Sequence, residues 1–229
     1  MIDYSTKLLG LIGEKINYTI SPQIHNLFYQ LEGINAVYLV FDIKRKKVSN
    51  IFHVLIEITH GLNMGIPYKV FLSRQLPLSK EAEVSGAINT VFKSKGFNTD
   101  YLAFKSLVNE KIDKVSNCLV FGAGGAARAS IYALSELGCD VFVINLFKEE
   151  VLELESHFSK FDIKVKHVNS RVNLNYDVLV NATPDPGAGG EGGLQVRDLG
   201  REVREAEGRK EGGAPDRFGT HGGQCEGRA

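Results

Sequence analysis

Along the first half of the chain, strand-like apolar runs alternate with stretches that have helical spacing of hydrophobic and polar positions. This alternation predicts a layered α/β lobe. Apolar runs at residues 8–13 and 36–41 have the length and composition of buried strands, and helix-like stretches lie between and after them. Strands that alternate with helices favour a largely parallel sheet. One helix is expected to begin at Ser21, a serine N-cap, because Pro22 follows it at the first helical position. We expect this lobe to occupy residues 1–105.

The same patterning predicts a second, nucleotide-binding domain after residue 105. A buried strand runs directly into a glycine-rich turn, and helices and strands then alternate. This order is half of a doubly wound, Rossmann-like sheet, whose ligands lie at the carboxyl ends of its strands. We expect this incomplete domain at residues 106–184. Its predicted strands are residues 118–121, 140–144, 163–168 and 177–181, and its predicted helices are residues 125–137 and 148–160.

The composition of the chain changes abruptly after Pro184. Residues 185–229 contain 13 glycines and no Ile, Asn or Tyr, and arginine outnumbers lysine there although lysine outnumbers arginine upstream. A segment so poor in branched and aromatic residues cannot bury enough apolar surface to offset its ordering entropy. We therefore expect a disordered or foreign tail, which is either a flexible natural extension or the product of a frame error or chimeric junction.

Charge and hydropathy favour a small-molecule partner. The 27 basic and 27 acidic residues cancel, so no overall field draws the protein to nucleic acid or to an anionic membrane. No apolar run reaches the roughly 18 residues that a membrane span needs, and the N-terminus lacks the pattern of a signal peptide. We expect a soluble cytoplasmic protein that is a monomer or a homodimer.

The three cysteines predict neither a metal site nor a disulfide. Cys118, Cys139 and Cys225 are odd in number and lack the spacing of a zinc site or a redox pair. We expect reduced thiols, the first two of them buried as small apolar groups.

A glycine-rich segment between a predicted strand and a predicted helix matches the G-x-G-x-x-A form of the dinucleotide fingerprint. Its first glycine permits a tight turn, the second lets the backbone approach a pyrophosphate, and the final alanine lets the helix pack on its strand. The helix N-terminus then offers amides and partial positive charge to the phosphates. The alternative is a glycine turn that binds nothing. The expected cofactor contacts are Gly122, Ala123, Gly124, Gly125 and Ala126, with Ala127 at the packed position.

The end of the second predicted strand favours NADP over NAD. A carboxylate about twenty positions beyond the first glycine would hold the ribose of NAD, but the segment from Asn145 to Lys148 contains none. A 2′-phosphate would therefore meet no repulsion there, and Lys148 either pairs with it or is simply solvated. Thr183 ends a further strand and is expected at the same ligand-binding edge. NAD remains the alternative cofactor.

Polar clusters follow the predicted strands of the first lobe and outline one pocket. Lys69 and Asp100 are the members suited to catalysis. If the two converge, the carboxylate holds the ammonium, which can relay a proton to a carbonyl oxygen as a hydride reaches the carbon. The alternative is a surface ion pair worth less than about 1 kcal/mol. The other polar members of these clusters include Thr19, Ser21, Asn63 and Asn89.

Six motifs occur in order along the chain. They are Ser21-Pro22-Gln23-Ile24-His25-Asn26, Asn63-Met64-Gly65-Ile66-Pro67-Tyr68-Lys69, Gly86-Ala87-Ile88-Asn89-Thr90, Asn98-Thr99-Asp100, the glycine-rich turn through Arg128, and Asn181-Ala182-Thr183-Pro184. Taken in this order, they resemble the motifs of the shikimate dehydrogenases, which reduce 3-dehydroshikimate to shikimate with NADPH on the route through chorismate to the aromatic amino acids. The resemblance covers about residues 9–184.

The resemblance implies roles for six residues. It implies that Lys69 and Asp100 are the catalytic pair. It further implies that Thr19 and Ser21 bind the substrate carboxylate and that Asn63 and Asn89 line the pocket around the ring hydroxyls.

The chain also departs from the pattern of that family. Gly65 replaces a threonine, Leu146 replaces an arginine near the adenine and the 2′-phosphate, and Tyr101 replaces a glycine and either crowds the pocket mouth or packs away from it. Residues 185–229 do not resemble the closing helices, one of which carries a glutamine to the substrate; Gln195 lacks the expected surroundings. Three functions follow: a shikimate dehydrogenase-like oxidoreductase, a relative that also uses quinate, and a truncated non-catalytic remnant that binds nucleotide or substrate.

Overall fold

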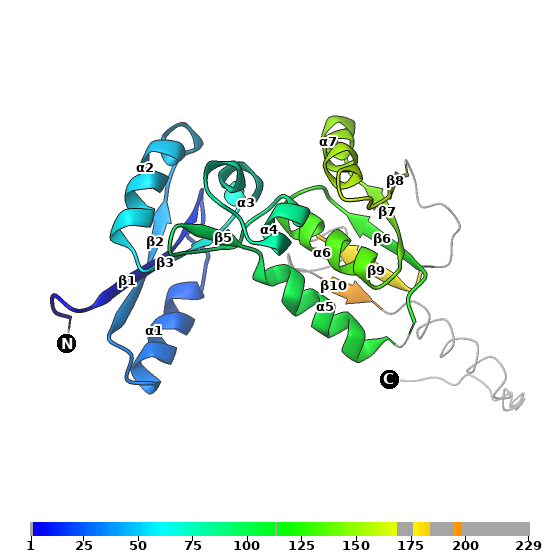
Figure 1. Cartoon of the computed structure of the whole chain (residues 1–229). Helices are drawn as coiled ribbons and strands as arrows, with labels where there is room; N and C mark the ends of the chain where they lie inside the picture. Colours follow the sequence, from blue (N-terminus) through cyan, green and yellow to red (C-terminus); the bar gives the residue numbers. More distant parts are fainter. Residues whose placement is uncertain (1, 113, 169–175, 184–194, 198–229) are drawn as a thin grey trace, which may run out of the picture.

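The described residues form two five-stranded sheets with helices packed against them (Figure 1). The computed structural model describes residues 2–112, 114–168, 176–183 and 195–197. The strand orders are β2-β1-β3-β4-β5 in the first sheet and β10-β9-β6-β7-β8 in the second. None of the described helices is long and apolar enough to cross a membrane.

The first sheet is parallel over three strands and closes with an antiparallel hairpin. Strands β1, β2 and β3 run parallel, whereas β4 is antiparallel to β3 and β5 to β4. The predicted parallel sheet is therefore confirmed for β1, β2 and β3. The strands are β1 (Lys7–Gly13), β2 (Ala36–Asp42), β3 (Gly61–Met64), β4 (Thr90–Phe92) and β5 (Lys95–Phe97). The helices are α1 (Ser21–Leu31), α2 (Arg45–Ile58), α3 (Tyr68–Phe71), η1 (Leu72–Gln75) and α4 (Lys80–Ser85).

One face of the first sheet is covered by α2. Its buried residues Val48, Phe52 and Leu55 recur at helical spacing and share a core with Ile12 of β1 and Leu62 of β3. This core fixes the carboxyl ends of β1 and β3 side by side, because Ile12 is in register with Met64. The loops that follow these two strands carry the polar clusters predicted from the sequence.

The second sheet has the strand order of half a doubly wound fold, as predicted. Strands β8, β7, β6 and β9 are parallel and neighbours in that order, and β10 adds an antiparallel edge. Each predicted element is present within two residues of its expected bounds. The elements are α5 (Thr99–Lys111), β6 (Asn117–Phe121), α6 (Gly125–Glu136), β7 (Asp140–Ile144), α7 (Lys148–Ser159), β8 (Val165–His167), β9 (Val178–Asn181) and β10 (Gln195–Arg197).

Helix α5 connects the two halves. Its buried residues Tyr101, Phe104 and Val108 belong to the core of the second sheet, and the boundary expected at residue 105 falls within this helix. The tail predicted for residues 185–229 lies outside the described residues except for β10, whose three residues form a strand.

The predicted serine cap of α1 is wrong. The N-cap is Ile20, and Ser21 is already helical. The hydroxyl of Thr19 accepts the backbone amide of Ser21 at 3.2 Å and donates to its hydroxyl at 3.0 Å. Because Thr19 satisfies this amide, the helix begins one residue earlier than expected, with Pro22 still in its first turn.

The prediction of reduced thiols is wrong for two of the three cysteines. Cys118 in β6 and Cys139 just before β7 form a disulfide, with their Cα atoms 6.2 Å apart. The parallel pairing of β6 with β7 brings the two residues together although 21 positions separate them. Both side chains are buried, as expected. Cys225 lies outside the described residues.

Candidate active site

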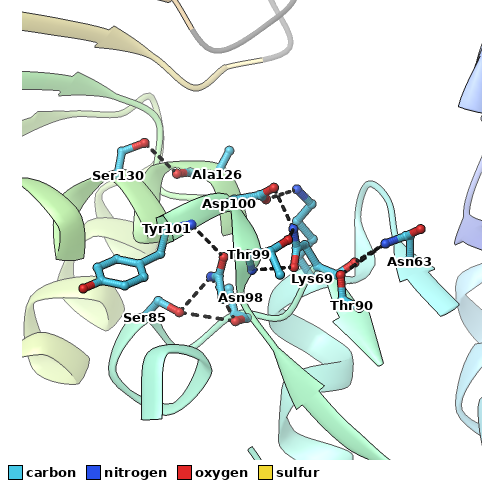
Figure 2. A network of polar contacts seen from close by, with 12 residues as sticks. Asn63, Lys69, Ser85, Thr90, Asn98, Thr99, Asp100, Tyr101, Ala126 and Ser130 are labelled. Carbon is cyan, nitrogen blue, oxygen red and sulfur yellow. Dashed lines mark hydrogen bonds and ion pairs between the residues drawn. The ribbon is translucent and has the colours of Figure 1, made fainter. Parts of the chain in front are cut away.

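Lys69 and Asp100 form an ion pair between the two halves of the molecule (Figure 2). Lys69 follows β3 and lies in the short helix α3, whereas Asp100 lies in the first turn of α5. The Lys69 Nζ and the Asp100 Oδ2 are 2.6 Å apart, and the two side chains are 24% and 36% exposed. The pair is thus partly shielded from water yet open to a ligand, which a proton relay requires.

The carboxylate of Asp100 is held from both sides. Its second oxygen, Oδ1, accepts from the Asn89 Nδ2 at 2.7 Å, and the same amide group also donates to the Thr99 hydroxyl at 2.8 Å. The Asn89 Oδ1 in turn accepts the Thr99 backbone amide at 2.9 Å. The N-terminus of α5 also favours a negative charge at this position. Asn89 therefore fixes the orientation of Asp100.

Asn98 anchors the helix that carries Asp100. Its side chain is buried and caps α5 by accepting the backbone amide of Tyr101 at 3.2 Å. Its Nδ2 donates to the Ser85 hydroxyl at 2.9 Å and to the Ala87 carbonyl at 3.1 Å (Figure 2). The cap ties the start of α5 to the first half of the molecule and so keeps Asp100 opposite Lys69.

Asn63 is bound by a network that the sequence did not predict. Its Oδ1 accepts from the buried hydroxyl of Tyr38 at 2.7 Å, and its Nδ2 donates to the Asn89 carbonyl and the Thr90 hydroxyl at 3.3 and 3.2 Å. Tyr38 lies in β2, beside β1. Burial raises the pKa of the Tyr38 phenol, so it donates in this contact. The only sequence signal for Tyr38 was its position in a predicted strand.

Thr19 and Ser21 lie at the same edge of the sheet as Asn63 and Lys69. They follow the end of β1, which is parallel to β3 and in register with it. The carboxyl ends of parallel neighbours meet at one edge, where ligands bind in open α/β sheets. Their two hydroxyls are hydrogen-bonded to each other at 3.0 Å.

The two departures near this pocket have structural explanations. A Cβ on Gly65 would lie 3.1 Å from the Ile12 carbonyl oxygen, so a larger residue would need its neighbour to move. Tyr101 packs away from the pocket mouth, which decides between the two alternatives. Its ring stacks on Tyr132 with centroids 4.4 Å apart, and its hydroxyl hydrogen-bonds Glu136. Burial and the contact with Glu136 raise the pKa of Tyr101 to about 12.

The glycine-rich turn has the geometry of the dinucleotide fingerprint. Gly122 has a φ of 103° and donates its amide to the Ile144 carbonyl at 2.8 Å, and a Cβ there would lie 3.0 Å from the Ala182 oxygen. Ala127 is fully buried. A Cβ on Gly124 would meet nothing within 4 Å, so the backbone there is open to a pyrophosphate. These features fit a dinucleotide at the start of α6.

Lys69 lies directly against this turn. A Cβ on Gly125, the first residue of α6, would stand 2.5 Å from the Cβ of Lys69. The predicted catalytic lysine and the predicted cofactor turn are therefore neighbours although they belong to different sheets. A cofactor held by the turn would lie beside the ion pair.

The expectation that no carboxylate reaches the end of β7 is wrong. The Asn145 Nδ2 donates to the Glu150 Oε2 at 2.8 Å and to the Phe147 carbonyl at 3.0 Å. Glu150 lies in the first turn of α7, which folds back over the strand end. Glu150 lies five residues beyond Asn145, so the residues next to the strand end gave no sign of a carboxylate that only the helical turn brings there. Lys148 and Leu146 are exposed beside it.

Thr183 lies two residues after the end of β9, at the strand end where it was expected, and its position is fixed by Asn181. Its backbone amide and its hydroxyl both donate to the Asn181 Oδ1, at 3.1 and 2.7 Å. Asn181 is buried beside Phe121 of β6, in register with it. Thr183 thus lies next to Gly122 at the carboxyl edge of the second sheet, within 3.4 Å of a Cβ built there.

Polar contacts on a second side also join the two halves. Arg74 of η1 pairs with Glu153 of α7, which lies 3.6 Å from the buried Arg128 of α6. The His157 Nε2 is 3.0 Å from the Val84 carbonyl. Burial lowers the pKa of His157, and the positive charge of Arg128 lowers it further, so the ring is neutral and donates to the carbonyl.

The part of the chain that the structure describes holds no group of three or more His, Cys, Asp or Glu suited to a metal ion.

Comparisons with known proteins show which proteins this chain is similar to. The family model described as the shikimate dehydrogenase substrate binding domain matches residues 11–91. A shikimate dehydrogenase of Sulfurisphaera tokodaii is 50% identical over 185 residues, which cover 81% of this chain and 70% of the relative. A shikimate dehydrogenase (NADP(+)) of Sulfolobus acidocaldarius is 50% identical over 186 residues, which cover 80% and 70%. A crystal structure of a shikimate dehydrogenase in complex with NADP+ is 29% identical, with a TM-score of 0.70 over 80% of this chain and 69% of that one.

Proposed function

The chain belongs to the shikimate dehydrogenase family, and we propose that Lys69 and Asp100 are the catalytic pair of its reaction. It is an NADP-dependent oxidoreductase that acts on a CH-OH group. Its reaction is the reversible reduction of 3-dehydroshikimate to shikimate. One observation carries the proposal. The partly shielded Lys69–Asp100 pair, 2.6 Å between its charged atoms, lies against the turn expected to hold the cofactor.

Lys69 handles the proton of the reaction. NADPH, when bound, supplies the hydride to the substrate carbon. The Lys69 ammonium donates a proton to the carbonyl oxygen as negative charge develops there, and in the oxidative direction the neutral amine accepts the proton of the hydroxyl. Asp100 orients the Lys69 side chain and balances its charge. Asn89 keeps the second carboxylate oxygen occupied, so Asp100 cannot turn away.

The remaining residues orient the substrate. Thr19 and Ser21 present hydroxyls beside the N-terminus of α1, where an anion such as the substrate carboxylate is favoured. Asn63 and Asn89 offer amide groups that can donate to and accept from ring hydroxyls. Hydrogen bonds to Tyr38, Thr90 and the Asn89 carbonyl hold the Asn63 amide in one orientation before a ligand arrives. This lowers the entropic cost of binding.

The second sheet supplies the cofactor site. The backbone of the turn and the N-terminus of α6 suit the pyrophosphate, since Gly124 leaves the approach open. The end of β7 suits the adenosine ribose. The residues proposed to hold NADP are Gly122, Ala123, Gly124, Gly125, Ala126, Asn145, Lys148 and Thr183. We place the enzyme in the cytoplasm, in the biosynthesis of aromatic amino acids through chorismate.

A spectrophotometric assay of shikimate-dependent NADP reduction tests the proposal. The purified full chain should turn over shikimate, and Lys69→Ala should lower kcat by about 10²- to 10⁴-fold. Lys111→Ala is the matched control, because Lys111 is 62% exposed and lies at the C-terminal end of α5, the opposite end from Asp100, so its loss should leave the rate unchanged. Folded protein without turnover, or a Lys69→Ala variant as active as the control, would refute the assignment.

A further inference from the structure

Asp100 and Tyr101 are neighbours in the first turn of α5, but their side chains bind opposite halves of the molecule. The Asp100 carboxylate contacts Lys69 and Asn89 of the first half. The Tyr101 ring points away from Lys69 and packs in the core of the second half (Figure 2). Its hydroxyl donates a hydrogen bond to Glu136 of α6. A contact with the half that carries the glycine-rich turn therefore lies one residue from Asp100.

The Glu136 carboxylate joins α5 to α6 through both of its oxygens. One oxygen, Oε2, accepts from the Tyr101 hydroxyl and from the Lys105 Nζ, the latter at 2.6 Å. Both donors lie on α5, one helical turn apart, and so face the same side of the helix. The other oxygen, Oε1, accepts from the Tyr132 hydroxyl of α6 itself at 3.1 Å. The Tyr132 ring in turn stacks on that of Tyr101.

Glu136 occupies a place on α6 where a carboxylate is otherwise unfavourable. It is the last residue of the helix, where the macrodipole favours cations over anions. Burial alone would raise the pKa of the Glu136 carboxyl, but hydrogen bonds from Lys105, Tyr101 and Tyr132 outweigh it and lower the pKa below its ordinary value. The carboxylate is therefore charged, which makes its hydrogen bonds roughly twice as strong as neutral ones. The contact with α5 explains this carboxylate, whereas the stability of α6 by itself does not.

The two helices that Glu136 joins each begin with a part of the candidate site. Asp100 lies in the first turn of α5, and α6 begins at Gly125, against which the Lys69 side chain packs. Glu136 is the twelfth residue of α6, about 16 Å from Gly125 along the helix axis. The first turn of α5 is thus held near both ends of α6. Two contacts so far apart fix the orientation of that turn, which the contact at Gly125 alone would leave free to rotate.

We propose that Glu136 is a positioning residue for the reaction: through Tyr101 and Lys105 it orients the first turn of α5, so that Asp100 and Lys69 face a cofactor held by the glycine-rich turn. The inference rests on the proposed roles of Lys69 and Asp100. Glu136 itself moves neither the proton nor the hydride. Loss of its contact should slow hydride transfer and spare the binding of shikimate and NADP, because the residues proposed to bind them keep their own hydrogen bonds.

Hydride transfer in a single turnover tests the proposal, with the full chain in excess over NADP and with saturating shikimate. Glu136→Gln keeps the shape of the side chain but removes its charge. It should lower the rate of NADP reduction about ten-fold, because a 1 Å misplacement can cost up to roughly 10²-fold. In the steady state kcat and kcat/KM should fall together, since ground-state binding is kept. A residue that only stabilised the fold would change the folded fraction and leave the single-turnover rate of the folded chain as it is.

Tyr101→Phe is an independent variant, because it removes one hydroxyl and keeps the stacked ring. It should slow hydride transfer as well. Combined with Glu136→Gln, it should lose less than the product of the two single losses, since both changes break one contact. Glu110→Gln is the matched control. Its carboxylate is 71% exposed near the C-terminal end of α5, and its loss should leave the rate unchanged.

Circular dichroism and urea unfolding establish that each variant is folded in the assay. A folded Glu136→Gln variant as fast as Glu110→Gln overturns the inference and leaves the proposed function standing. A defect confined to KM, or losses that multiply in the double variant, overturn it in the same way. If Glu136→Gln unfolds, an unchanged rate in Tyr101→Phe has this effect. A wild-type chain without turnover overturns the proposed function, and this inference with it.

Discussion

The side chain of Lys69 lies flat against Gly125 at the start of α6. A Cβ on Gly125 would stand 2.5 Å from the Lys69 Cβ and 2.9 Å from its Cδ. At Gly124, one residue earlier, a Cβ would meet no protein atom within 4 Å. The two glycines therefore serve different purposes. Gly125 gives room to a side chain of the other half of the molecule, and Gly124 gives room to a ligand.

This difference predicts distinct kinetic defects for two one-carbon substitutions. Gly125→Ala should displace the Lys69 stem and lower kcat by roughly 10²-fold, a loss that a 1 Å misplacement can cause. Overpacking should also lower stability by about 1–3 kcal/mol. Gly124→Ala should leave stability and kcat nearly unchanged and raise the KM for NADP roughly ten-fold, or about 1.4 kcal/mol. Steady-state kinetics with both substrates and urea unfolding measure these effects. Equal effects of the two substitutions would contradict the geometry.

The sequence was sufficient for the fold because the signals were local and mutually consistent. Gly122 follows a buried strand and precedes a helix that begins with small residues, so the turn, its positive φ and the strand order all follow from one motif. Lys69 and Asp100 come from separate motifs, and nothing in their spacing gave the 2.6 Å separation. The family resemblance implied their pairing. In the structure the pairing depends on Asn98, which caps α5 and so fixes the position of Asp100.

The errors arose where a contact depends on tertiary packing. Ser21 has the residue type of an N-cap, but it is already helical, and the hydroxyl of Thr19 accepts its backbone amide. Cys118 and Cys139 have no recognised spacing, and only the pairing of β6 with β7 brings them together. Glu150 reaches the end of β7 because a helical turn folds it back. In each case the residue type was visible in the sequence and the partner was not.

The disulfide should stabilise the second half of the molecule. Cys118 and Cys139 close a loop with a sequence separation of 21, and cross-linking a loop of this size constrains the unfolded chain by about 3 kcal/mol. Cys118→Ala with Cys139→Ala should lower the free energy of unfolding in urea by about this amount. A reducing agent should do the same to the wild-type chain and leave the double variant unaffected.

A thiol titration in denaturant checks the redox state directly. The unreduced chain should show one reactive thiol, from Cys225, and the reduced chain three. Three reactive thiols before any reduction would show that the disulfide does not form.

His157 should make the protein less stable in mild acid. Its pKa is lowered from 6.5 by burial and by the charges of Arg128 and Lys160, and the hydrogen bond to the Val84 carbonyl offsets this only in part. The unfolded chain therefore binds the proton more readily. The free energy of unfolding should fall as the pH drops below 6.5, and the loss should level off below the folded pKa.

Urea unfolding between about pH 7.5 and about pH 5 measures this dependence. His157→Gln is the informative variant, because glutamine retains a donor for the Val84 carbonyl and cannot gain a charge. Its stability should vary less with pH than that of the wild-type chain. The pKa of His25 is also lowered, so the difference between the two curves isolates His157. Parallel curves would rule out the assigned role.

Glu150 should weaken the preference of the enzyme for NADP over NAD. Its carboxylate is held at the end of β7 by the Asn145 Nδ2 at 2.8 Å, where the adenosine ribose of a dinucleotide lies in this fold. A carboxylate there repels a 2′-phosphate and can accept a hydrogen bond from a 2′-hydroxyl. Glu150→Gln should raise kcat/KM for NADP relative to NAD by roughly ten-fold, or about 1.4 kcal/mol.

Glu149→Gln provides the matched control for this change. Glu149 lies one residue away in the same first turn of α7, so its loss alters the net charge and the helix terminus equally. If Glu150 acts through its position beside Asn145, only Glu150→Gln should shift the ratio strongly, and the shift should shrink at high salt. A similar shift in both variants would mean that only the overall charge of the helix terminus matters. A shift towards NAD in Glu150→Gln would show that this carboxylate does not face the 2′ position.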